Sequence, residues 1–551
     1  MAIISIDKKQ FEKEIGNLNE EMQERIAMFG TPIEKISKNE LQLEIFPNRP
    51  DMLSYHGFKR SFLAFLGKQT GLKKYAVKKP EKNYKVKIDA SVKKIRPYTA
   101  CAIIKGLRLN DEKIKEIIEI QEKLHITLGR KRKKIAIGIY PLEKIKLPIT
   151  FKALEPDKIK FIPLESDRKM SGLEILQKHP AGRDYAHLLA GKMKFPIFTD
   201  ANNNILSMPP IINSKLTGKI TQKTRDIFVE CSGFDFEALK KCLNIIVVNL
   251  SDMGGKIYQM EIKFRRRKEI TPNLDSEKKK INLNNTNKLL GLNLNEKELR
   301  KLLGKMGYSY NKKTVEIPPW RTDIMHEVDL IEDVAIAYGY ENFIPEIPEI
   351  STIGEVNTRE MIKNKISEIL AGIGMLEISN YHLTNKNDQF TKMGRGKKQE
   401  KEFIEVQQSK TDFTILRKDL THYLLKTLSE NVDSEYPQLI FEIGKVFDLE
   451  NDNVLEKENI AAAISPGNFT KIRQILEYLF KMIDLKIEFK EEEKPIHPSY
   501  FIEGRVASIF LEGNRIGFIG EIHPKILNSW KIKMPVALFE IESQKIFERL
   551  E

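Results

Sequence analysis

The chain of 551 residues is longer than one hydrophobic core normally serves, so three or four domains are expected. Lysine and arginine number 92 against 77 acidic residues, and the formal net charge of +15 favours a polyanionic partner such as nucleic acid. Three cysteines without CxxC spacing support neither a disulfide framework nor a cysteine zinc site. No apolar run approaches the ~20 residues of a membrane span, so we expect a cytoplasmic protein.

Polar stretches rich in lysine and proline divide the chain into four predicted domains. Their bounds are 1–85, 86–268, 269–345 and 346–551. In the first domain, Asp51 is the predicted N-cap of a helix whose aromatic residues recur at helical spacing up to Phe65. The mixture of helical and strand-like runs that follows predicts a multidomain α+β fold.

The second domain has a helical pattern over residues 112–129 and two runs that we expect to be strands. These runs are "KKIAIGIY" (133–140) and "IIVVNL" (245–250). Between the helix and the first run, the basic stretch Gly129–Lys134 can be a solvated turn or a contact for phosphate groups. In the fourth domain helices alternate with strand-like runs such as "LIFEIGKVFDL" (439–449), which predicts a mostly antiparallel sheet with helices against it.

In the third domain, the stretch "RTDIMHEVDLIED" (321–333) concentrates carboxylates in an otherwise basic chain. A helix that began near Asp323 would carry an apolar core stripe, formed by Ile324, Val328, Ile331 and Ala335. Beside that stripe fall four acids: Asp323, Asp329, Glu332 and Asp333. They could converge on a hard cation that takes oxygen ligands, Mg²⁺ above all. Alternatively, they lie near a helix N-terminus because the helix macrodipole favours negative charge there.

This stretch, with its continuation "VAIAYGYENF", resembles the signature of the β subunit of phenylalanyl-tRNA synthetase. Other motifs similar to the family follow in its order: "FPNRPDMLSYHG", "EKLHITLGRKRKKIAIGIY", "SMPPIINSKLTGKITQKTRDIFVECSG", "FEIGKVFDL" and "IGFIGEIHPKIL". The resemblance covers essentially the whole chain, and it is to the archaeal and eukaryotic form rather than the bacterial one.

The resemblance implies an N-terminal domain, a tRNA-editing domain, a metal-bearing winged-helix-like domain and a catalytically inactive class II synthetase-like domain built on an antiparallel sheet. It also implies a heterotetramer of two α and two β subunits that binds the phenylalanine tRNA. The α subunit would perform the ATP-dependent attachment of phenylalanine, so no catalytic residue for aminoacylation is expected in this chain. The four acids of the third domain are the implied Mg²⁺ ligands.

In the family, the editing domain hydrolyses tyrosine wrongly attached to the tRNA. A hydrophobic pocket rejects the extra tyrosine hydroxyl only modestly, so a second site that hydrogen-bonds this hydroxyl is needed. The candidate residues are Ser207, Asn213, Ser214, Asp226 and Glu230. Either acid would bind the tyrosine hydroxyl or ammonium, while Ser207 and Asn213 would position the ester or its attacking water. Alternatively, "SMPPIINS" is a proline-forced turn whose polar side chains cap backbone groups.

Two functions of other classes remain open. The acidic cluster could serve a magnesium-dependent nuclease or phosphotransferase. The chain could also be a non-catalytic tRNA-binding scaffold in which editing has decayed.

Overall fold

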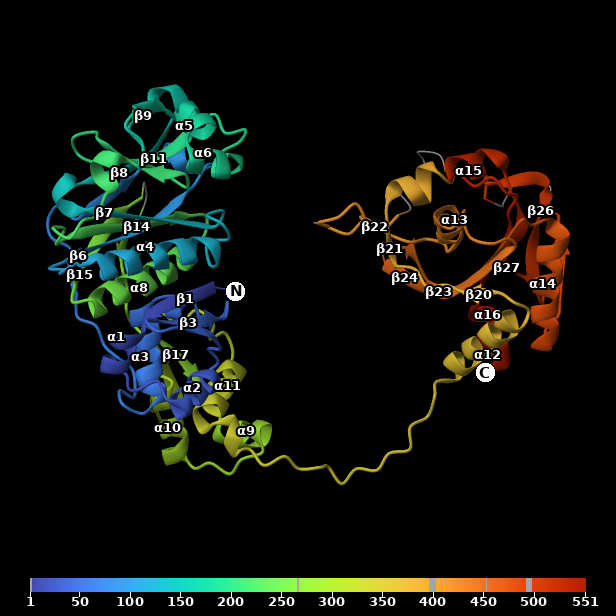
Figure 1. Cartoon of the computed structure of the whole chain (residues 1–551), viewed down its shortest axis with the longest axis horizontal. Helices are drawn as coiled ribbons and strands as arrows, with labels where there is room; N and C mark the ends of the chain where they lie inside the picture. Colours follow the sequence, from blue (N-terminus) through green and yellow to red (C-terminus); the bar gives the residue numbers. More distant parts are fainter. Residues whose placement is uncertain (1, 265–266, 396–402, 408, 452, 492–497) are drawn as a thin grey trace. The chain divides into compact units, whose positions relative to one another are not determined.

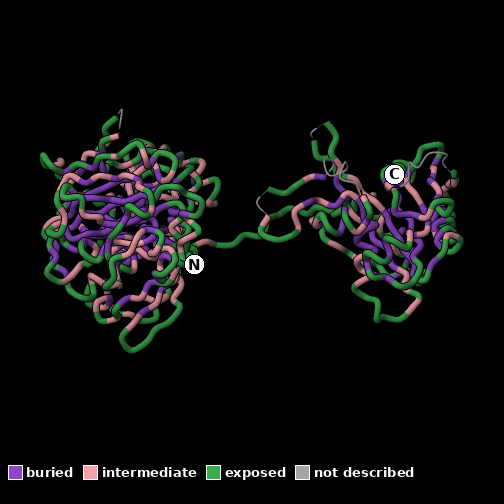
Figure 2. Tube along the Cα trace, turned by 90° about the horizontal axis from the view of Figure 1, so that it is seen from above, coloured by how far each residue is buried: buried purple, intermediate pink, exposed green. Residues whose placement is uncertain are grey.

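The computed structural model describes residues 2–264, 267–395, 403–407, 409–451, 453–491 and 498–551. The chain divides into two compact units, Met1–Ile347 and Pro348–Glu551, shown in Figure 1. Buried residues fill the interior of each unit, whereas the stretch between the units is exposed (Figure 2). The predicted multidomain α+β fold is confirmed. The predicted boundary after residue 345 lies near this division, and those after residues 85 and 268 fall inside the first unit.

The N-terminal part of the first unit is a small antiparallel sheet covered by helices, with strand order β1-β3-β2. Its elements are β1 (Ala2–Asp7), α1 (Lys8–Glu14), α2 (Glu20–Met28), β2 (Ile33–Ile36), β3 (Glu40–Ile45) and α3 (Tyr55–Phe65). The aromatic helix predicted here is α3, but the prediction of Asp51 as its N-cap is wrong. Ser54 caps α3 by accepting the Gly57 N–H at 3.1 Å, because the Asp51 carboxylate is buried in an ion pair with Arg49.

The middle of the first unit is built on an eleven-stranded sheet. Nine strands follow the order β13-β12-β11-β8-β5-β15-β6-β14-β7, and β4 and β16 pair with β15. The strands are β4 (Val77–Lys78), β5 (Lys85–Ile88), β6 (Tyr98–Lys105), β7 (Ile135–Pro141), β8 (Ile149–Leu154), β11 (Phe195–Thr199), β12 (Ile205–Met208), β13 (Ile212–Asn213), β14 (Ile227–Gly233), β15 (Lys256–Lys263) and β16 (Lys268–Thr271). A two-stranded ribbon adds β9 (Lys160–Phe161) and β10 (Met170–Ser171). The helices are α4 (Asp111–Ile126), α5 (Gly172–Lys178), α6 (Pro180–Tyr185), α7 (Lys215–Gly218) and α8 (Phe236–Asp252).

One predicted strand of this region is a helix. The run 133–140 forms β7 as expected, but 245–250 lies inside α8. The Asp235 carboxylate caps α8 by accepting the N–H groups of Glu237 and Ala238. Residues Leu243–Leu250 of the helix are all buried, so the apolar run carries no helical periodicity, and a short run of that kind cannot be told from a buried strand.

The last part of the first unit combines helices with a three-stranded antiparallel sheet of order β17-β19-β18. Its elements are β17 (Glu277–Lys280), α9 (Leu283–Leu290), α10 (Glu296–Lys305), β18 (Ser309–Asn311), β19 (Thr314–Ile317) and α11 (Glu327–Tyr338). One continuous hydrophobic core joins all three parts, since it includes Phe58 of α3, Leu243 of α8 and Leu303 of α10.

The second unit is a seven-stranded sheet of order β20-β23-β24-β28-β27-β26-β25. Among its described strand pairs only β20 and β23 run parallel, which confirms the mostly antiparallel prediction. Ala462 and Ile464 belong to one core, while Ala461 and Ala463 belong to another, so both faces of the sheet are covered. The strands are β20 (Leu376–Glu377), β23 (Gln438–Glu450), β24 (Asn453–Ser465), β25 (Ile487–Lys490), β26 (Phe501–Leu511), β27 (Asn514–Ile522) and β28 (Ala537–Glu542), with β21 (Leu383–Thr384) and β22 (Ile415–Leu416) as a separate pair. The helices are α12 (Thr358–Gly372), α13 (Thr421–Glu430), α14 (Phe469–Met482), α15 (Pro524–Ser529) and α16 (Gln544–Leu550).

Candidate active site

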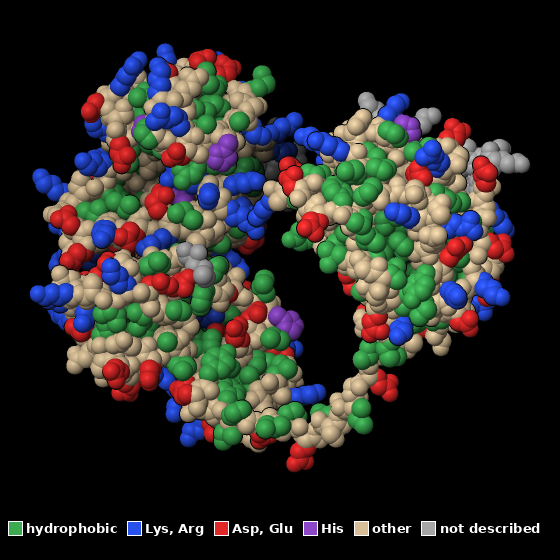
Figure 3. Space-filling model, turned by 45° about the vertical axis from the view of Figure 1, so that its right-hand side comes forward, with side chains coloured by type: hydrophobic (Ala, Val, Ile, Leu, Met, Phe, Trp, Pro, Cys, Tyr) green, Lys and Arg blue, Asp and Glu red, His purple; other side chains and the backbone are tan. Residues whose placement is uncertain are grey.

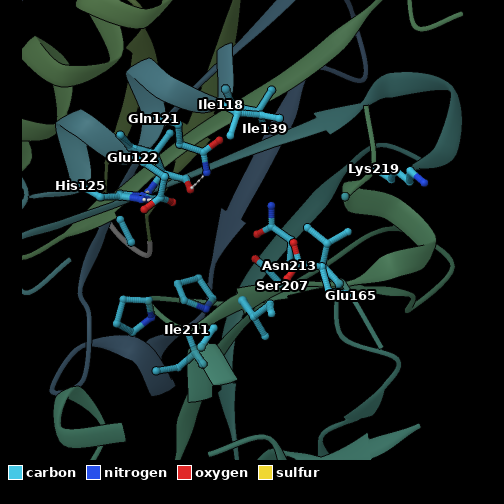
Figure 4. Close-up of a pocket in the computed structure, with 18 of the residues that line it drawn as sticks. Ile118, Gln121, Glu122, His125, Ile139, Glu165, Ser207, Ile211, Asn213 and Lys219 are labelled. Carbon is cyan, nitrogen blue, oxygen red and sulfur yellow. Dashed lines mark hydrogen bonds and ion pairs between the residues drawn. The ribbon is translucent and has the colours of Figure 1, made fainter. Parts of the chain in front are cut away.

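A cavity of about 960 Å³ lies in the first unit, between α4 on one side and the β12–β13 hairpin with α7 on the other (Figure 4). Strands β7 and β14 supply further lining residues, among them Ile139 and Glu230. The volume is that of a site for a ligand of substrate or cofactor size. Isoleucines line part of it, and polar and charged side chains make up nearly half of the lining residues.

The hairpin brings two of the predicted site residues together. Strands β12 and β13 are antiparallel, and Ser207 lies directly opposite Asn213. Pro209 and Pro210 lie in the turn, where their missing N–H groups prevent the ladder from continuing. Residues opposite each other in a ladder point to the same face of the sheet, and Figure 4 shows both side chains on one side of the cavity.

Glu230 meets this pair from β14, where it lies opposite Gly138 of β7. The Tyr140 hydroxyl donates to Ser207 Oγ at 2.8 Å and lies 3.3 Å from Glu230 Oε1. A side chain on Gly138 would overlap the Tyr140 hydroxyl and place its Cβ 2.6 Å from Glu230 Oε1. Glycine at position 138 is therefore required for these three side chains to meet.

Burial keeps the carboxyl group of Glu230 mostly protonated at pH 7. Burial raises its pKa to about 8, and the charge of Arg96 opposes this shift without cancelling it. Its Oε2 atom is buried and has no hydrogen-bond partner among the described residues. A neutral carboxyl group can donate one hydrogen bond and accept others, so it can pair with a hydroxyl group placed in the cavity.

On the opposite wall, Arg132 links α4 to the hairpin. Its Nη2 donates to Glu122 Oε1 at 2.7 Å, and its Nη1 donates to the Ile211 carbonyl at 2.9 Å. His125 Nε2 accepts the Ile137 N–H at 2.8 Å, and its Nδ1 lies 3.2 Å from Glu122 Oε1. Burial lowers the pKa of His125. Both of its nitrogens are thus engaged, and the histidine positions the wall.

His179 has one ring nitrogen without a hydrogen-bond partner among the described residues. Its Nε2 lies 3.0 Å from the Leu164 carbonyl, which fixes the ring proton on that nitrogen. The Nδ1 atom is buried and has no partner among the described residues. His179 lines the cavity, and its Nδ1 keeps a vacant lone pair that can accept a proton.

Three of the five editing candidates line the cavity: Ser207, Asn213 and Glu230. The other two do not. Ser214 is buried at the start of α7, and Asp226 Oδ1 accepts the Gly106 N–H at 2.9 Å elsewhere.

Sequence reasoning missed Tyr140, His179 and the role of Arg132. The basic run before β7 contains Arg132 and indicates a possible phosphate contact. It gives no indication that Arg132 hydrogen-bonds the carbonyl of Ile211 in the hairpin turn.

The predicted start of the acidic helix is wrong. Helix α11 begins at Glu327 with His326 as N-cap, and Asp323 lies in the non-helical segment before it. The Asp329 carboxylate accepts the N–H groups of Met325 and His326, both at 2.7 Å, which is the capping role that the macrodipole alternative describes. Val328, placed in the core stripe by the prediction, is 48% exposed.

Arg321 pairs with two of the four acids. Its Nε and Nη2 donate to the two carboxylate oxygens of Asp323 at 2.8 and 2.7 Å, and Nη2 also donates to Asp333 Oδ2 at 2.8 Å. Tyr308 donates a further hydrogen bond to Asp333. Burial, and then the charges of the neighbouring carboxylates, raise the pKa of Glu332.

As they lie, these side chains do not fit a metal ion. Within the described part of the chain, no three or more His, Cys, Asp or Glu side chains are grouped so that they could hold one. The positive charge of Arg321 stands where a cation would neutralise the acids, so the Mg²⁺ site stays a prediction from the sequence.

The surface charge is dispersed. Lysine and arginine side chains are interleaved with acidic ones over the visible face of both units (Figure 3). In the described residues, no helix has the length and apolar character that a membrane span requires.

Comparison with known proteins places this architecture in a family. Residues 279–340 match the tRNA synthetase B5 domain, and residues 344–543 match the phenylalanyl tRNA synthetase beta chain CLM domain. An N-terminal fragment of the phenylalanyl-tRNA synthetase beta subunit from Pyrococcus horikoshii superimposes with a TM-score of 0.58 at 37% identity, over 61% of this chain and 99% of the fragment. The phenylalanine–tRNA ligase beta subunit of Pyrococcus furiosus is 39% identical over 90% of this chain and 89% of its own length. That of Archaeoglobus fulgidus is 38% identical over 100% of this chain and 99% of its own. With this identity sustained from end to end, the chain belongs to the phenylalanine–tRNA ligase beta subunit family.

Proposed function

We propose that the cavity beside Glu230 hydrolyses tyrosine from mischarged phenylalanine tRNA. The observation that carries this proposal is a buried neutral carboxyl group with an unpartnered oxygen in the wall of a substrate-sized cavity. A tyrosine side chain lying among the isoleucines would bring its hydroxyl to Glu230 Oε2. Phenylalanine would leave that oxygen buried and unpaired, and sites of this kind reject the analogue that lacks the hydroxyl.

The polar side chains around Glu230 support a hydrolytic step. Water attacks the carbonyl carbon of the aminoacyl ester, the bond from that carbon to the ribose oxygen breaks, and the ribose oxygen takes a proton. The vacant Nδ1 of His179 would accept the proton of the attacking water. The Asn213 amide, opposite Ser207 on the hairpin, would donate to the carbonyl oxygen as it gains negative charge.

The proposed assembly follows from the family. This chain would act as the β subunit beside an α subunit that attaches phenylalanine, in a cytoplasmic heterotetramer of two α and two β subunits that binds the phenylalanine tRNA. Residues 86–268 would form the editing domain, 269–345 a winged-helix-like domain and 346–551 a non-catalytic class II synthetase-like domain. The native mass of the complex, with phenylalanine-dependent exchange of pyrophosphate into ATP, tests this assignment. A lone monomer without exchange would contradict it.

Deacylation of Tyr-tRNA and Phe-tRNA by the complex tests the site. Glu230→Ala should reduce the preference for Tyr-tRNA about tenfold, because one hydrogen bond to the substrate is lost. Glu230→Gln should keep most of that preference at pH 7, since it is also neutral. Asp226→Asn, which lies outside the cavity, is the matched control and should not change it. Tyr-tRNA deacylation that is absent, or that is indifferent to Glu230→Ala, would leave the scaffold function instead.

A further inference from the structure

A second cavity, of about 230 Å³, lies between α3 and the last part of the first unit. Its lining residues fall in the ranges 49–73 and 306–321, and none of them is an editing candidate. A water molecule occupies ~30 Å³ in the liquid, so this cavity has room for about seven water molecules or one small polyatomic ion. Its charged lining is entirely cationic: Arg49, Arg60, Lys73 and Arg321. Each of the three arginines is more than nine-tenths buried, which is rare for a side chain that is always charged.

The guanidinium groups of these arginines can be compared directly. Each has a bidentate edge formed by Nε and Nη2, the edge that matches the two oxygens of a carboxylate or phosphate. In Arg49 this edge holds Asp51, with both distances 2.9 Å. In Arg321 the same edge holds Asp323, at 2.8 and 2.7 Å.

In Arg60 the bidentate edge holds nothing. Its Nη1 donates to Asp252 Oδ2 at 2.5 Å, and the guanidinium carbon lies 4.9 Å from the ring centre of Trp320, which fixes the plane of the group. Both Nε and Nη2 are buried without a hydrogen-bond partner among the described residues. A third buried donor in the same cavity wall, Nη1 of Arg321, also lacks one.

The local charges favour an anion at Arg60. Asp252 is paired with two cations, since Lys73 Nζ also lies 2.7 Å from its Oδ1. This end of the cavity therefore carries one positive charge beyond what its carboxylate neutralises. At the other end, one guanidinium of Arg321 faces the carboxylates of Asp323 and Asp333, so the anion is expected at the Arg60 end.

We propose that this cavity binds a small oxyanion of the phosphate class, with two of its oxygens on the Nε–Nη2 edge of Arg60 and Arg321 Nη1 as a further donor in the same lining. The proposal does not depend on the editing function. Free phosphate, pyrophosphate and a phosphate group of tRNA share this chemistry, and the experiment separates them.

The experiment measures binding of inorganic phosphate and pyrophosphate to the full chain by calorimetry and by the shift in melting temperature, against sodium chloride of the same ionic strength. Arg60→Lys keeps the charge but removes the bidentate edge, and it should weaken phosphate binding about tenfold or more. Lys73→Gln removes an exposed charge without disturbing the core, so it gives a second reading if Arg60→Lys does not fold. The half-buried Arg25, outside the cavity, supplies the control Arg25→Lys, which should bind phosphate as the wild type does.

Three outcomes support the proposal, each naming a source of the phosphate group. Pyrophosphate that binds more tightly than phosphate indicates a free diphosphate, and the reverse order indicates free phosphate. Phosphate that competes with tRNA for the wild type, but not for Arg60→Lys, indicates a phosphate of the tRNA. Equal shifts with phosphate and chloride, or phosphate binding that both Arg60→Lys and Lys73→Gln leave unchanged, would overturn it and assign the cavity to water.

Discussion

Replacing Glu230 by glutamine should remove the loss of stability that Glu230 causes as the pH rises. In the folded chain Glu230 has a pKa of about 8 in place of its ordinary 4.5. The folded state therefore binds the proton more tightly than the unfolded state, so the stabilisation is complete below pH 4.5 and is lost as the pH rises through 8. By linkage, the part still to be lost between pH 7 and 9.5 is about 1.4 kcal/mol of the free energy of unfolding. Glutamine does not titrate and loses none of it.

The assay is denaturant unfolding of the wild type and Glu230→Gln at both pH values. The chain has two tryptophans, and only Trp320 lies in the first unit. A Trp530→Phe background therefore lets fluorescence report on the unit that contains the cavity. The difference in unfolding free energy between the two proteins should move by about 1.4 kcal/mol in favour of glutamine between pH 7 and 9.5.

The matched control is Glu237→Gln, because Glu237 is an exposed residue at the start of α8 in the same unit. It should show no pH-dependent difference from the wild type. If the Glu230→Gln difference stays constant across this pH range, Glu230 is ionised at pH 7, and the neutral-acid basis of tyrosine recognition is refuted.

Other substitutions test the remaining contacts. His179→Gln keeps a donor for the Leu164 carbonyl but removes the vacant ring nitrogen, and it should slow Tyr-tRNA deacylation by about 10² to 10⁴-fold with an unchanged melting temperature. Gly138→Ala should cost about 1 to 3 kcal/mol in denaturant unfolding and abolish deacylation, because its methyl group overlaps the Tyr140 hydroxyl; a fully active Gly138→Ala protein would contradict the packing described. Arg321→Ala removes the cation that pairs with Asp323 and with the buried Asp333, and should cost about 3 to 5 kcal/mol. Magnesium should then raise the melting temperature of this variant more than that of the wild type, and equal responses would argue against any cation site at these acids.

Local patterns in the sequence predict much of this fold, and they fail where burial removes the pattern. The helices α4 and α12 alternate apolar and polar faces and could be predicted directly. Helix α8 is buried on nearly every side, so its apolar run looks like a strand. The sequence predicts too early a start for α11 because Asp323 has the chemistry of an N-cap, and only the structure shows that Arg321 holds its carboxylate.

The candidate site could be predicted only as far as its hairpin. Ser207 and Asn213 lie close in sequence on either side of two prolines, so a turn brings them together. Glu230 meets Gly138 through the pairing of β14 with β7, and no local pattern fixes which residues of two distant strands become neighbours. The same holds for His179, whose importance rests on a free nitrogen and not on its spacing from other histidines.

The carboxyl groups at the two cavities of the first unit are neutralised in two ways, and the choice fits each cavity to a different ligand. Asp51 and Asp252 are paired with arginines, so they stay ionised and hold those guanidinium groups in place. Glu230 has no guanidinium within hydrogen-bonding distance among the described residues, and burial leaves it protonated instead. A protonated acid presents no net charge to the cavity, which suits an uncharged phenol hydroxyl. An arginine whose acid is satisfied by one nitrogen keeps its other edge free, which suits an oxyanion. The class of ligand that each cavity suits therefore depends on whether an arginine lies close enough to pair with the buried acid of that cavity.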